Sequence, residues 1–350
     1  MTRILFFTFL LIFSACSNTK NLKVKPVKVK TNISKIAFGS CSKEDKEQPI
    51  LETVLTKDPE LFIYLGDNIY GDTRDMDVLK AKYAKLNAKE EFQNLRNQCM
   101  VLATWDDHDF GENDAGKHYP LKEESKEIFL DFWKEPKKSK RRKHDGIYHS
   151  LMFGKDAQKV QVILLDTRTF RNDLSLSGND KQWKHDYKPN TNPDSTFLGA
   201  QQWEWLEEQF KIPAKVRIIA SSNQFSHEYN GYESWTNVPH EQQKMLDLIK
   251  KTKASGVVFI SGDVHWGELS KLKNDGGYPI YDVTSSGITE NWDSVEPNEN
   301  RLGEVIRENN FGMINIDWSL SDPLLTFLII DINGTSRVEY KVKLSGLTFQ

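Results

Sequence analysis

Cysteine is scarce in this sequence, with three residues in a chain of 350, and this scarcity excludes a disulfide-stapled scaffold. A large excess of charge of one sign is also missing. The formal net charge is -3 at pH 7, which gives no global reason to expect nucleic acid as a partner. What is present is an ordinary globular balance of 38% hydrophobic and 28% charged residues. The length suits one large α/β domain with a sizeable core.

The first 15 residues predict a targeting segment that is removed from the mature protein. Arg3 supplies a short positive region, and the apolar stretch Ile4–Phe13 is too short to span a bilayer as a helix. The sequence Phe13-Ser14-Ala15-Cys16 resembles a bacterial lipobox, in which the cysteine is diacylated and becomes the new N-terminus. A plain secretory signal with an incidental Cys16 is the alternative. Both interpretations predict an exported protein.

A lipid anchor at Cys16 would attach the protein to a membrane. Ser17, rather than Asp, follows Cys16. By resemblance to the known sorting habit, this predicts an outer-membrane lipoprotein of a Gram-negative cell, facing the periplasm or the cell surface. Residues 16–34 are polar and lysine-rich without apolar periodicity, so we expect a flexible basic tether there. The folded domain is expected over residues 35–345.

Apolar runs typical of buried strands alternate with stretches of amphipathic helical spacing, which predicts βαβ units. The clearest strand is Leu61–Leu65, an unbroken run of aromatic and branched residues. Asn333-Gly334 favours a hairpin turn between the last two strands. The other predicted strands are 35–38, 100–105, 146–154, 159–165, 217–224, 257–261, 278–285, 312–318, 324–332 and 337–344, and the predicted helices are 48–57, 78–96, 123–133, 200–210 and 240–251.

Acidic and histidine side chains follow several of these strands at the point where each ends. Asp67 follows Leu61–Leu65, and two later strands end in Asp106–Asp109 and Asp263–His265. In open α/β sheets ligands bind beyond the carboxyl ends of strands, so these side chains could face one centre. Unpaired acids this close would repel one another, and a bound cation is the natural remedy. The alternative, for each cluster alone, is an ordinary acidic turn.

Two further strand ends carry residues with more than one possible role. Cys41 follows the first strand, and a thiolate is a strong ligand for iron or zinc. The alternatives are a small buried hydrophobe or a disulfide with Cys99. Arg168 could clamp a phosphate as a bidentate fork, or form an ion pair with Asp166 or a neighbouring acid.

Five short motifs occur in order, each at the end of a predicted strand. They are Gly39-Ser40-Cys41, Gly66-Asp67-Asn68-Ile69-Tyr70-Gly71-Asp72, Trp105-Asp106-Asp107-His108-Asp109, Leu165-Asp166-Thr167-Arg168 and Gly262-Asp263-Val264-His265. Together they resemble the calcineurin-like metallophosphoesterases and, within them, the alkaline phosphatase D (PhoD-type) branch. The likeness extends from about Ile36 to Thr289. It implies a two-sheet α/β sandwich with helices outside (α/β/β/α), to which the Asn-Gly turn adds a C-terminal β-hairpin.

The resemblance also implies a metal centre with two kinds of ligand. Ferric iron would be held by a set with sulfur and phenolate, and calcium, as one or two ions, by an oxygen-rich set that shares a bridging carboxylate. The implied iron ligands are Cys41, Asp67, Tyr70 and His265, and the implied calcium ligands are Asp67, Asp107, Asn223 and Asp263. A hard oxygen shell suits calcium, while thiolate and imidazole suit a transition metal. Gln224 or Asn113 could take the place of Asn223.

The activity that the resemblance implies is hydrolysis of a phosphoric ester, with hydroxide from a water shared by two cations attacking phosphorus in line. Arg168 would neutralise the equatorial oxygens, and His108 would protonate the leaving group or merely orient a ligand. Some relatives carry histidine where Glu290 stands here, so a substrate contact at that point is not implied. The implied substrate is a phosphate-ester small molecule or a phospholipid.

Two other functions stay open. The same centre could act as a phosphodiesterase or phospholipase, and the basic stretch Lys134–Lys143 favours a membrane or polyanionic substrate. The protein could instead be a lipoprotein that binds metal without catalysis. In that case we expect Asp107 and Asp263 to lie far from Cys41.

Overall fold

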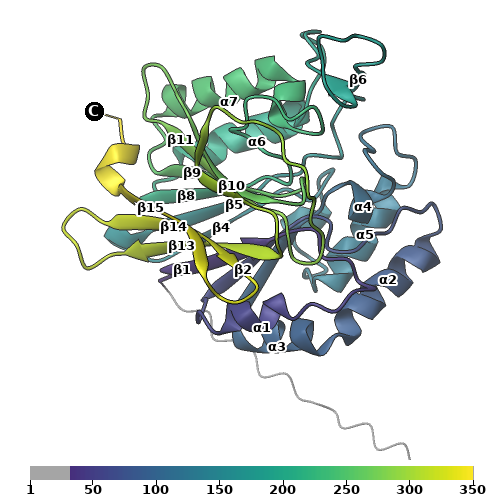
Figure 1. Cartoon of the computed structure of the whole chain (residues 1–350), viewed down its shortest axis with the longest axis horizontal. Helices are drawn as coiled ribbons and strands as arrows, with labels where there is room; N and C mark the ends of the chain where they lie inside the picture. Colours follow the sequence, from purple (N-terminus) through teal and green to yellow (C-terminus); the bar gives the residue numbers. More distant parts are fainter. Residues whose placement is uncertain (1–31, 350) are drawn as a thin grey trace, which may run out of the picture.

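Two β-sheets face each other at the centre of the computed structural model, which describes residues 32–349 (Figure 1). The predicted targeting segment 1–15, the predicted lipidation site Cys16 and all but the last three residues of the predicted tether lie outside the described residues. The first sheet has the order β15 (Ser336–Lys343), β14 (Leu324–Asp331), β13 (Asn310–Asp317), β1 (Lys35–Gly39), β2 (Leu61–Leu65) and β3 (Met100–Thr104).

The second sheet is larger and also mixed. Its order is β12 (Arg301–Ile306), β10 (Gly267–Leu272), β11 (Ile280–Ser285), β9 (Val257–Ser261), β8 (Val216–Ala220), β5 (Val160–Leu164) and β4 (His149–Phe153). Within the two sheets, β1, β2 and β3 are parallel, as are β5, β8, β9 and β11. The parallel strands form the middle of the second sheet and one side of the first, and antiparallel strands complete both.

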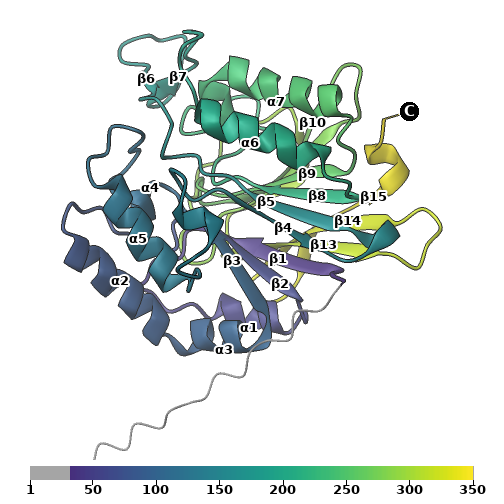
Figure 2. The same ribbon diagram turned by 180° about the vertical axis from the view of Figure 1, so that it is seen from behind.

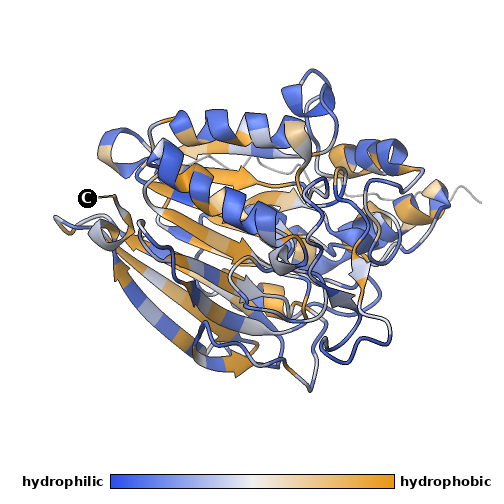
Figure 3. Ribbon diagram, turned by 90° about the horizontal axis from the view of Figure 1, so that it is seen from above, coloured by the Kyte–Doolittle hydropathy of each residue, from blue (hydrophilic) through white to orange (hydrophobic). Residues whose placement is uncertain are grey.

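Helices cover the outer face of each sheet (Figures 1 and 2). The pair α6 (Gly199–Lys211) and α7 (Pro239–Thr252) covers the second sheet, and the first is covered by α1 (Ile50–Leu55), α2 (Met76–Ala88), α3 (Glu90–Gln98) and α5 (Lys122–Phe132). Figure 3 shows apolar strands between helices whose outward faces are largely polar. This is the predicted α/β/β/α sandwich, and β14 and β15 form the predicted hairpin.

The strand β2 explains why the first sheet is buried on both sides. Leu61, Ile63 and Leu65 belong to the core between the two sheets. Phe62 and Tyr64 point the other way and pack in the core beneath the helices. Because successive side chains of a strand alternate between faces, only an unbroken apolar run suits this position. Each such fully buried side chain contributes about 1.5–3 kcal/mol through its burial.

The prediction of one helix over 78–96 was wrong. The chain forms two helices, because Lys89 has an extended backbone with ψ 133° that interrupts the helical hydrogen bonds after Ala88. Asp75 caps the first of them by accepting hydrogen bonds from the amides of Asp77 and Val78. The break lets α3 turn onto α1, so that Phe92 and Leu95 reach the core.

Several elements were not predicted. The strands β10 and β12 were not predicted, because their sequences mix apolar and charged residues. A short helix, α4 (Asp107–Phe110), begins immediately beyond β3, and the irregular excursion 172–196 contains the two-residue pair β6 (Ser175–Leu176) and β7 (Tyr187–Lys188). Short 3₁₀ turns occupy 140–142, 156–158, 235–237 and 344–347. Within residues 32–349, no helix has the length and apolar character needed to cross a membrane.

Candidate metal centre

Side chains from both sheets meet at one edge of the sandwich, beyond the carboxyl ends of the parallel strands. Cys41 follows β1, Asp67 follows β2, and Asp107 opens α4 just after β3. From the second sheet come Asn223 after β8 and Asp263 after β9. The hydroxyl of Thr104 donates to the carbonyl of Leu165 at 2.6 Å and thereby ties the end of β3 to the end of β5.

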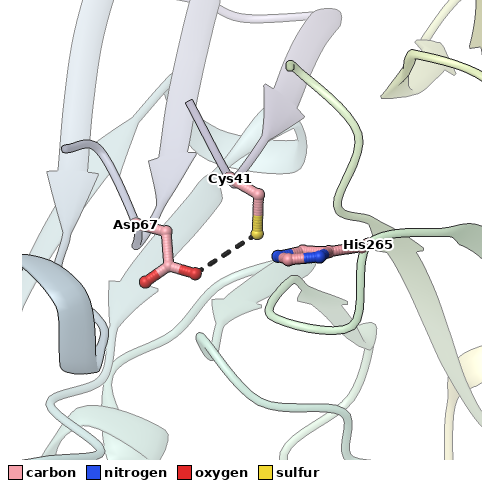
Figure 4. Close-up of side chains that lie close together, drawn as sticks. All are labelled: Cys41, Asp67 and His265. Carbon is pink, nitrogen blue, oxygen red and sulfur yellow. Dashed lines mark hydrogen bonds between the residues drawn. The ribbon is translucent and has the colours of Figure 1, made fainter. Parts of the chain in front are cut away.

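The first cluster joins a thiol, a carboxylate and an imidazole (Figure 4). One ligand atom from each of Cys41, Asp67 and His265 lies within 4.8 Å of the others. The thiol of Cys41 donates to Oδ2 of Asp67 at 3.3 Å. The phenol oxygen of Tyr70 lies 3.1 Å from Nε2 of His265, so all four implied iron ligands are neighbours.

The second cluster is purely acidic and shares Asp67 with the first. Carboxylate oxygens of Asp67, Asp106, Asp107 and Asp263 lie within 4.8 Å of one another. Oδ1 of Asp67 and Oδ1 of Asp107 are buried without a hydrogen-bond partner among the described residues, and so are both polar atoms of Asn223. Buried polar groups are normally hydrogen-bonded, so the oxygen atoms among these fit ligands of a cation.

The backbone at these positions is unusual for residues other than glycine. Cys41, Asp67, Asp263 and His265 all have positive φ, at 59°, 49°, 75° and 59° respectively. Left-handed backbone costs energy for a residue with a Cβ, and it persists where the surrounding structure enforces it. These strained turns contribute side chains to two clusters that share Asp67, which is an arrangement expected of a ligand-binding site.

Electrostatics in the protein alone disfavour the charged forms of these ligands. Burial raises the pKa of Cys41 well above its usual range, and the Asp67 carboxylate adds to the effect. Burial also raises the pKa of Asp67 and of Asp263, reinforced by neighbouring acids. Burial lowers the pKa of His265 to about 4, so its imidazole is neutral and free to coordinate. A bound cation would reverse the shifts of the acids and the thiol.

Asp107 behaves differently from its acidic neighbours. Burial opposes its ionisation, but the charges of Arg168 and His108 outweigh that cost and lower the pKa of Asp107 to about 2. Its Oδ2 accepts a hydrogen bond from the amide of Asp114 at 2.7 Å, which leaves Oδ1 free. Asp107 is therefore ionised even before any cation binds.

His108 lies beside both clusters. Its Nδ1 is 2.7 Å from Oδ1 of Asp72, and its ring is 4.3 Å from that of Tyr70. Burial opposes protonation of this imidazole, but Asp67, Asp107 and Asp72 outweigh it and raise the pKa of His108 to about 11. Asp72 belongs to the Gly66–Asp72 motif, yet the sequence did not indicate that it would hold His108.

Arg168 is completely buried and forms the ion pair that the sequence left as the alternative to a phosphate clamp. Its guanidinium donates to Asp106 and to both carboxylate oxygens of Glu233, and one of its nitrogens lies 3.6 Å from Oδ1 of Asp107. Asp166 accepts from the amides of Arg168 and Thr169 instead of pairing with the guanidinium.

Sequence reasoning missed the third acidic group. Carboxylate oxygens of Asp107, Asp114 and Glu233 also lie within 4.8 Å of one another. Asp114 stood in an acid-rich stretch and could have been suspected. Glu233 lies in a loop 65 residues beyond Arg168, its partner, and no local pattern marks it.

The alternatives that the sequence left open are now located. Gln224 donates to Glu268 at 2.6 Å and to Thr284 at 3.0 Å, so its amide is engaged away from the clusters, whereas Asn113 lines the pocket described below. Cys41 and Cys99 are both free thiols, and Cys99 donates to the carbonyl of Leu95.

A pocket of about 230 Å³ opens over the clusters. It is lined by Asp67, Asp107, His108, Asn113, Asp114, Asp186, Tyr187, Tyr232, Glu233, Asp263, Val264, His265 and Trp292. A larger groove of about 810 Å³ lies between α2 and α5, but none of the cluster residues lines it. The smaller pocket is the candidate active site, because it alone of the two exposes the unpaired acids.

Comparisons with known proteins identify relatives of this chain. The family model described as PhoD-like phosphatase matches residues 36–310. A curated relative, alkaline phosphatase D of Bacillus subtilis, is 24% identical over 297 residues, which cover 72% of this chain and 48% of the relative. The chain thus spans about half the length of this relative.

Solved structures show the same fold. A structure of PhoD has a TM-score of 0.66 at 17% identity and covers 89% of this chain and 72% of its own. A dimetal phosphatase from Danio rerio has a TM-score of 0.51 at 15% identity and covers 91% of this chain and 100% of its own. Because the family model spans most of the sequence, including every cluster residue from Cys41 to His265, this chain belongs to the PhoD-like phosphatase family.

Proposed function

We propose that this chain is a metal-dependent phosphoric ester hydrolase of the alkaline phosphatase type. The observation that carries the proposal is the pair of ligand clusters joined by Asp67, open to one pocket. When bound, cations would supply Lewis acidity that acidifies water and neutralises phosphate oxygens. The alternative of metal binding without catalysis predicted that Asp107 and Asp263 would lie far from Cys41, and the shared Asp67 argues against it.

The two clusters differ in softness, and we propose different metals for them. Cys41, Asp67, Tyr70 and His265 would hold ferric iron, because thiolate and imidazole favour a transition metal. Asp107, Asn223 and Asp263, with Asp67, would hold one or two calcium ions. Metal analysis of natively purified protein together with its visible absorption spectrum tests this assignment, since thiolate or phenolate bound to ferric iron absorbs visible light. A colourless, fully active enzyme would contradict it.

His108 is proposed as the general acid that protonates the leaving alkoxide. Its position in the pocket and its contact with Asp72 support this role. His108→Ala is expected to slow hydrolysis of esters with poor leaving groups far more than that of aryl esters, because a good leaving group needs no proton. An equal loss on both substrates, with reduced metal content, would indicate a role in orienting a ligand.

Arg168 is proposed to act on the phosphate through the acids that it holds. Its engagement by Asp106 and Glu233 supports this indirect role over direct contact. Arg168→Lys is expected to lower metal content and activity together, because a lysine ammonium cannot make the bidentate contacts of the guanidinium with these carboxylates. Loss of activity at full metal content would instead support direct contact with phosphate.

Hydrolysis of diesters is the second candidate function. The pocket extends past the ligands to Tyr232 and Trp292, which leaves room for a second ester arm. The basic stretch Lys134–Lys143 gives less support, because Arg141 is buried and Arg142 pairs with Glu127 and Asp131. Hydrolysis rates of p-nitrophenyl phosphate and bis(p-nitrophenyl) phosphate distinguish the two activities.

Export and lipid anchoring remain part of the proposal on the sequence alone. Diacylation of Cys16 would attach the enzyme to the outer membrane. Incorporation of labelled palmitate into the wild-type protein, and none into Cys16→Ala, is the expected result. Equal labelling of the two proteins, or none in either, would contradict the anchor.

A further inference from the structure

Aromatic rings form one wall of the active-site pocket. Tyr187, Tyr232 and Trp292 all line it. The rings of Tyr232 and Trp292 lie 5.2 Å apart, and the ring of Trp292 is 4.9 Å from that of His265. The amide of Trp292 donates to the carbonyl of His265 at 3.1 Å, so this wall is fixed directly beside the metal-ligand cluster. An ester arm that leaves the phosphate on this side must contact these rings.

Negative charge surrounds the same wall. Asp186 lines the pocket and is exposed, and its carboxylate forms no hydrogen bond or ion pair with another described residue. Glu296 stands behind the wall, where it is 2.6 Å from Nε2 of His185, whose ring stacks on Tyr232 at 4.5 Å. Burial raises the pKa of Tyr232, and the nearby charges of Glu296 and Asp186 raise it further.

Among the described residues, no lysine or arginine lines the pocket, and its basic groups are His108 and His265. An anionic arm on the substrate would therefore face carboxylates without a compensating cation outside the metal centre. A neutral apolar arm would use the rings but not Asp186. A cation over aromatic faces, with a carboxylate at the edge, uses both.

We propose that this wall is a subsite for an ester arm that carries an ammonium or quaternary ammonium group. Asp186, Tyr232 and Trp292 would bind the cation while the phosphate lies at the metal centre. The inference rests on the proposed phosphoester hydrolysis and names its substrate class, a phosphodiester with one cationic alcohol.

In the reaction the oxygen of water bonds to phosphorus, and the bond from phosphorus to one ester oxygen breaks. That oxygen leaves with the electron pair, and the proton of water passes to the leaving group or to solvent.

Three soluble p-nitrophenyl phosphodiesters test the subsite. They differ in the second alcohol, which is choline, its uncharged isostere 3,3-dimethylbutanol, or an alcohol of similar length that ends in a carboxylate. With metal-loaded enzyme we expect kcat/KM for the choline ester to exceed that for the isostere by about tenfold, the effect of a desolvated cation over aromatic rings. The carboxylate ester is expected to be the slowest of the three.

Variants of the wall residues then test whether this wall causes the preference for the choline ester. Asp186→Asn and Tyr232→Leu are expected to reduce the ratio of choline ester to isostere to about threefold or less, because each removes one attraction for the cation. Tyr232→Phe keeps the ring and is expected to keep the ratio. Asp194→Asn is the matched control, since Asp194 lies in the same excursion, outside the pocket lining, and loses the same charge.

The outcomes distinguish a failure of the proposed subsite from a failure of the proposed hydrolase activity. Equal rates on the choline ester and its isostere would overturn the subsite while leaving the hydrolase intact. No hydrolysis of any aryl ester by metal-loaded protein would overturn both. Where the preference is found, cleavage of glycerophosphocholine identifies a soluble source of the cationic arm, and cleavage of phosphatidylcholine vesicles identifies a lipid headgroup.

Discussion

Two groups of buried acids in this molecule differ in what faces their oxygen atoms. Glu268 on β10 and Asp282 on β11 are surrounded by donors from the protein itself. The donors are Gln224, Trp266, Asn298 and Arg301 for Glu268, and Phe225, Ser226 and Ser261 for Asp282. In the metal-ligand clusters, by contrast, Asp67, Asp106 and Asp107 each keep one buried oxygen without a hydrogen-bond partner among the described residues.

This contrast separates acids that stabilise the fold from acids that could bind a cation. Both groups bear the cost of burying charge, but the first recovers it from hydrogen bonds within the chain. In the second, Arg168 and His108 offset this cost for Asp107, whereas Asp67 and Asp106 keep raised pKa values that a bound cation would reverse. We therefore expect the first group to matter for stability and the second for metal content and activity.

Asp67→Asn should give the largest effect. The variant keeps the shape of the side chain but removes the charge that both clusters share, so we expect activity to fall by more than about 100-fold, beyond the loss typical of residues that only support a ligand. Metal content should fall with it. The metal-free variant should be at least as stable as the metal-free wild type in urea, because the neutral amide avoids the cost of ionising a buried carboxyl group. Full metal content with full activity would remove the distinction between the two groups.

Glu268→Gln should show the opposite pattern. Removing one partner of the buried pair with Arg301 is expected to lower the free energy of unfolding by about 3 kcal/mol. Urea titration measures this loss. Metal content and kcat/KM of the folded variant should stay unchanged, and a fall in either would connect this network to the metal centre.

Removal of the cations with a chelator should lower stability by a smaller amount. A cation at 100 times its Kd stabilises the folded protein by about 2.7 kcal/mol, and that contribution should disappear on chelation. Glu268→Gln should lose as much as the wild type, whereas Asp67→Asn should lose much less. Melting curves with and without chelator report these differences, and an equal loss in all three proteins would argue against Asp67 as a ligand.

The most gradual expected effect is the pH dependence of the free energy of unfolding that Asp282 causes. Burial raises its pKa from 3.8 to about 6, although its hydrogen bonds favour the charged form. The folded state therefore holds a proton that the unfolded chain has already released, so the stabilising contribution is complete below about pH 4 and is lost as pH rises through 6. Relative to Asp282→Asn, the free energy of unfolding should fall by up to about 1.4 kcal/mol per pH unit in that window. A difference that is constant with pH would contradict the shift.

The sequence could predict the convergence of Cys41, Asp67, Asp107 and Asp263 because each follows a strand, and the carboxyl ends of parallel strands meet at one edge. It could not predict that Glu233 joins the site. Glu233 lies in a loop, and the contacts of a loop residue depend on tertiary packing that leaves no periodic pattern in the sequence. The same limit hid the burial of Arg168, which depends on Glu233 and Asp106. The break at Lys89 and the half-polar strands β10 and β12 were missed because neighbouring elements, and not local propensity, decide them.

The hydroxyl of Thr104 that bonds the carbonyl of Leu165 has a consequence for how the molecule can be divided. Each sheet alone carries an incomplete set of ligands, and this contact joins the two sets where they meet. A fragment that retains one sheet would thus hold a partial coordination sphere with no function. Because the first sheet takes β1, β2 and β3 from one end of the described chain and β13, β14 and β15 from the other, no single cut in the gene separates the two sets.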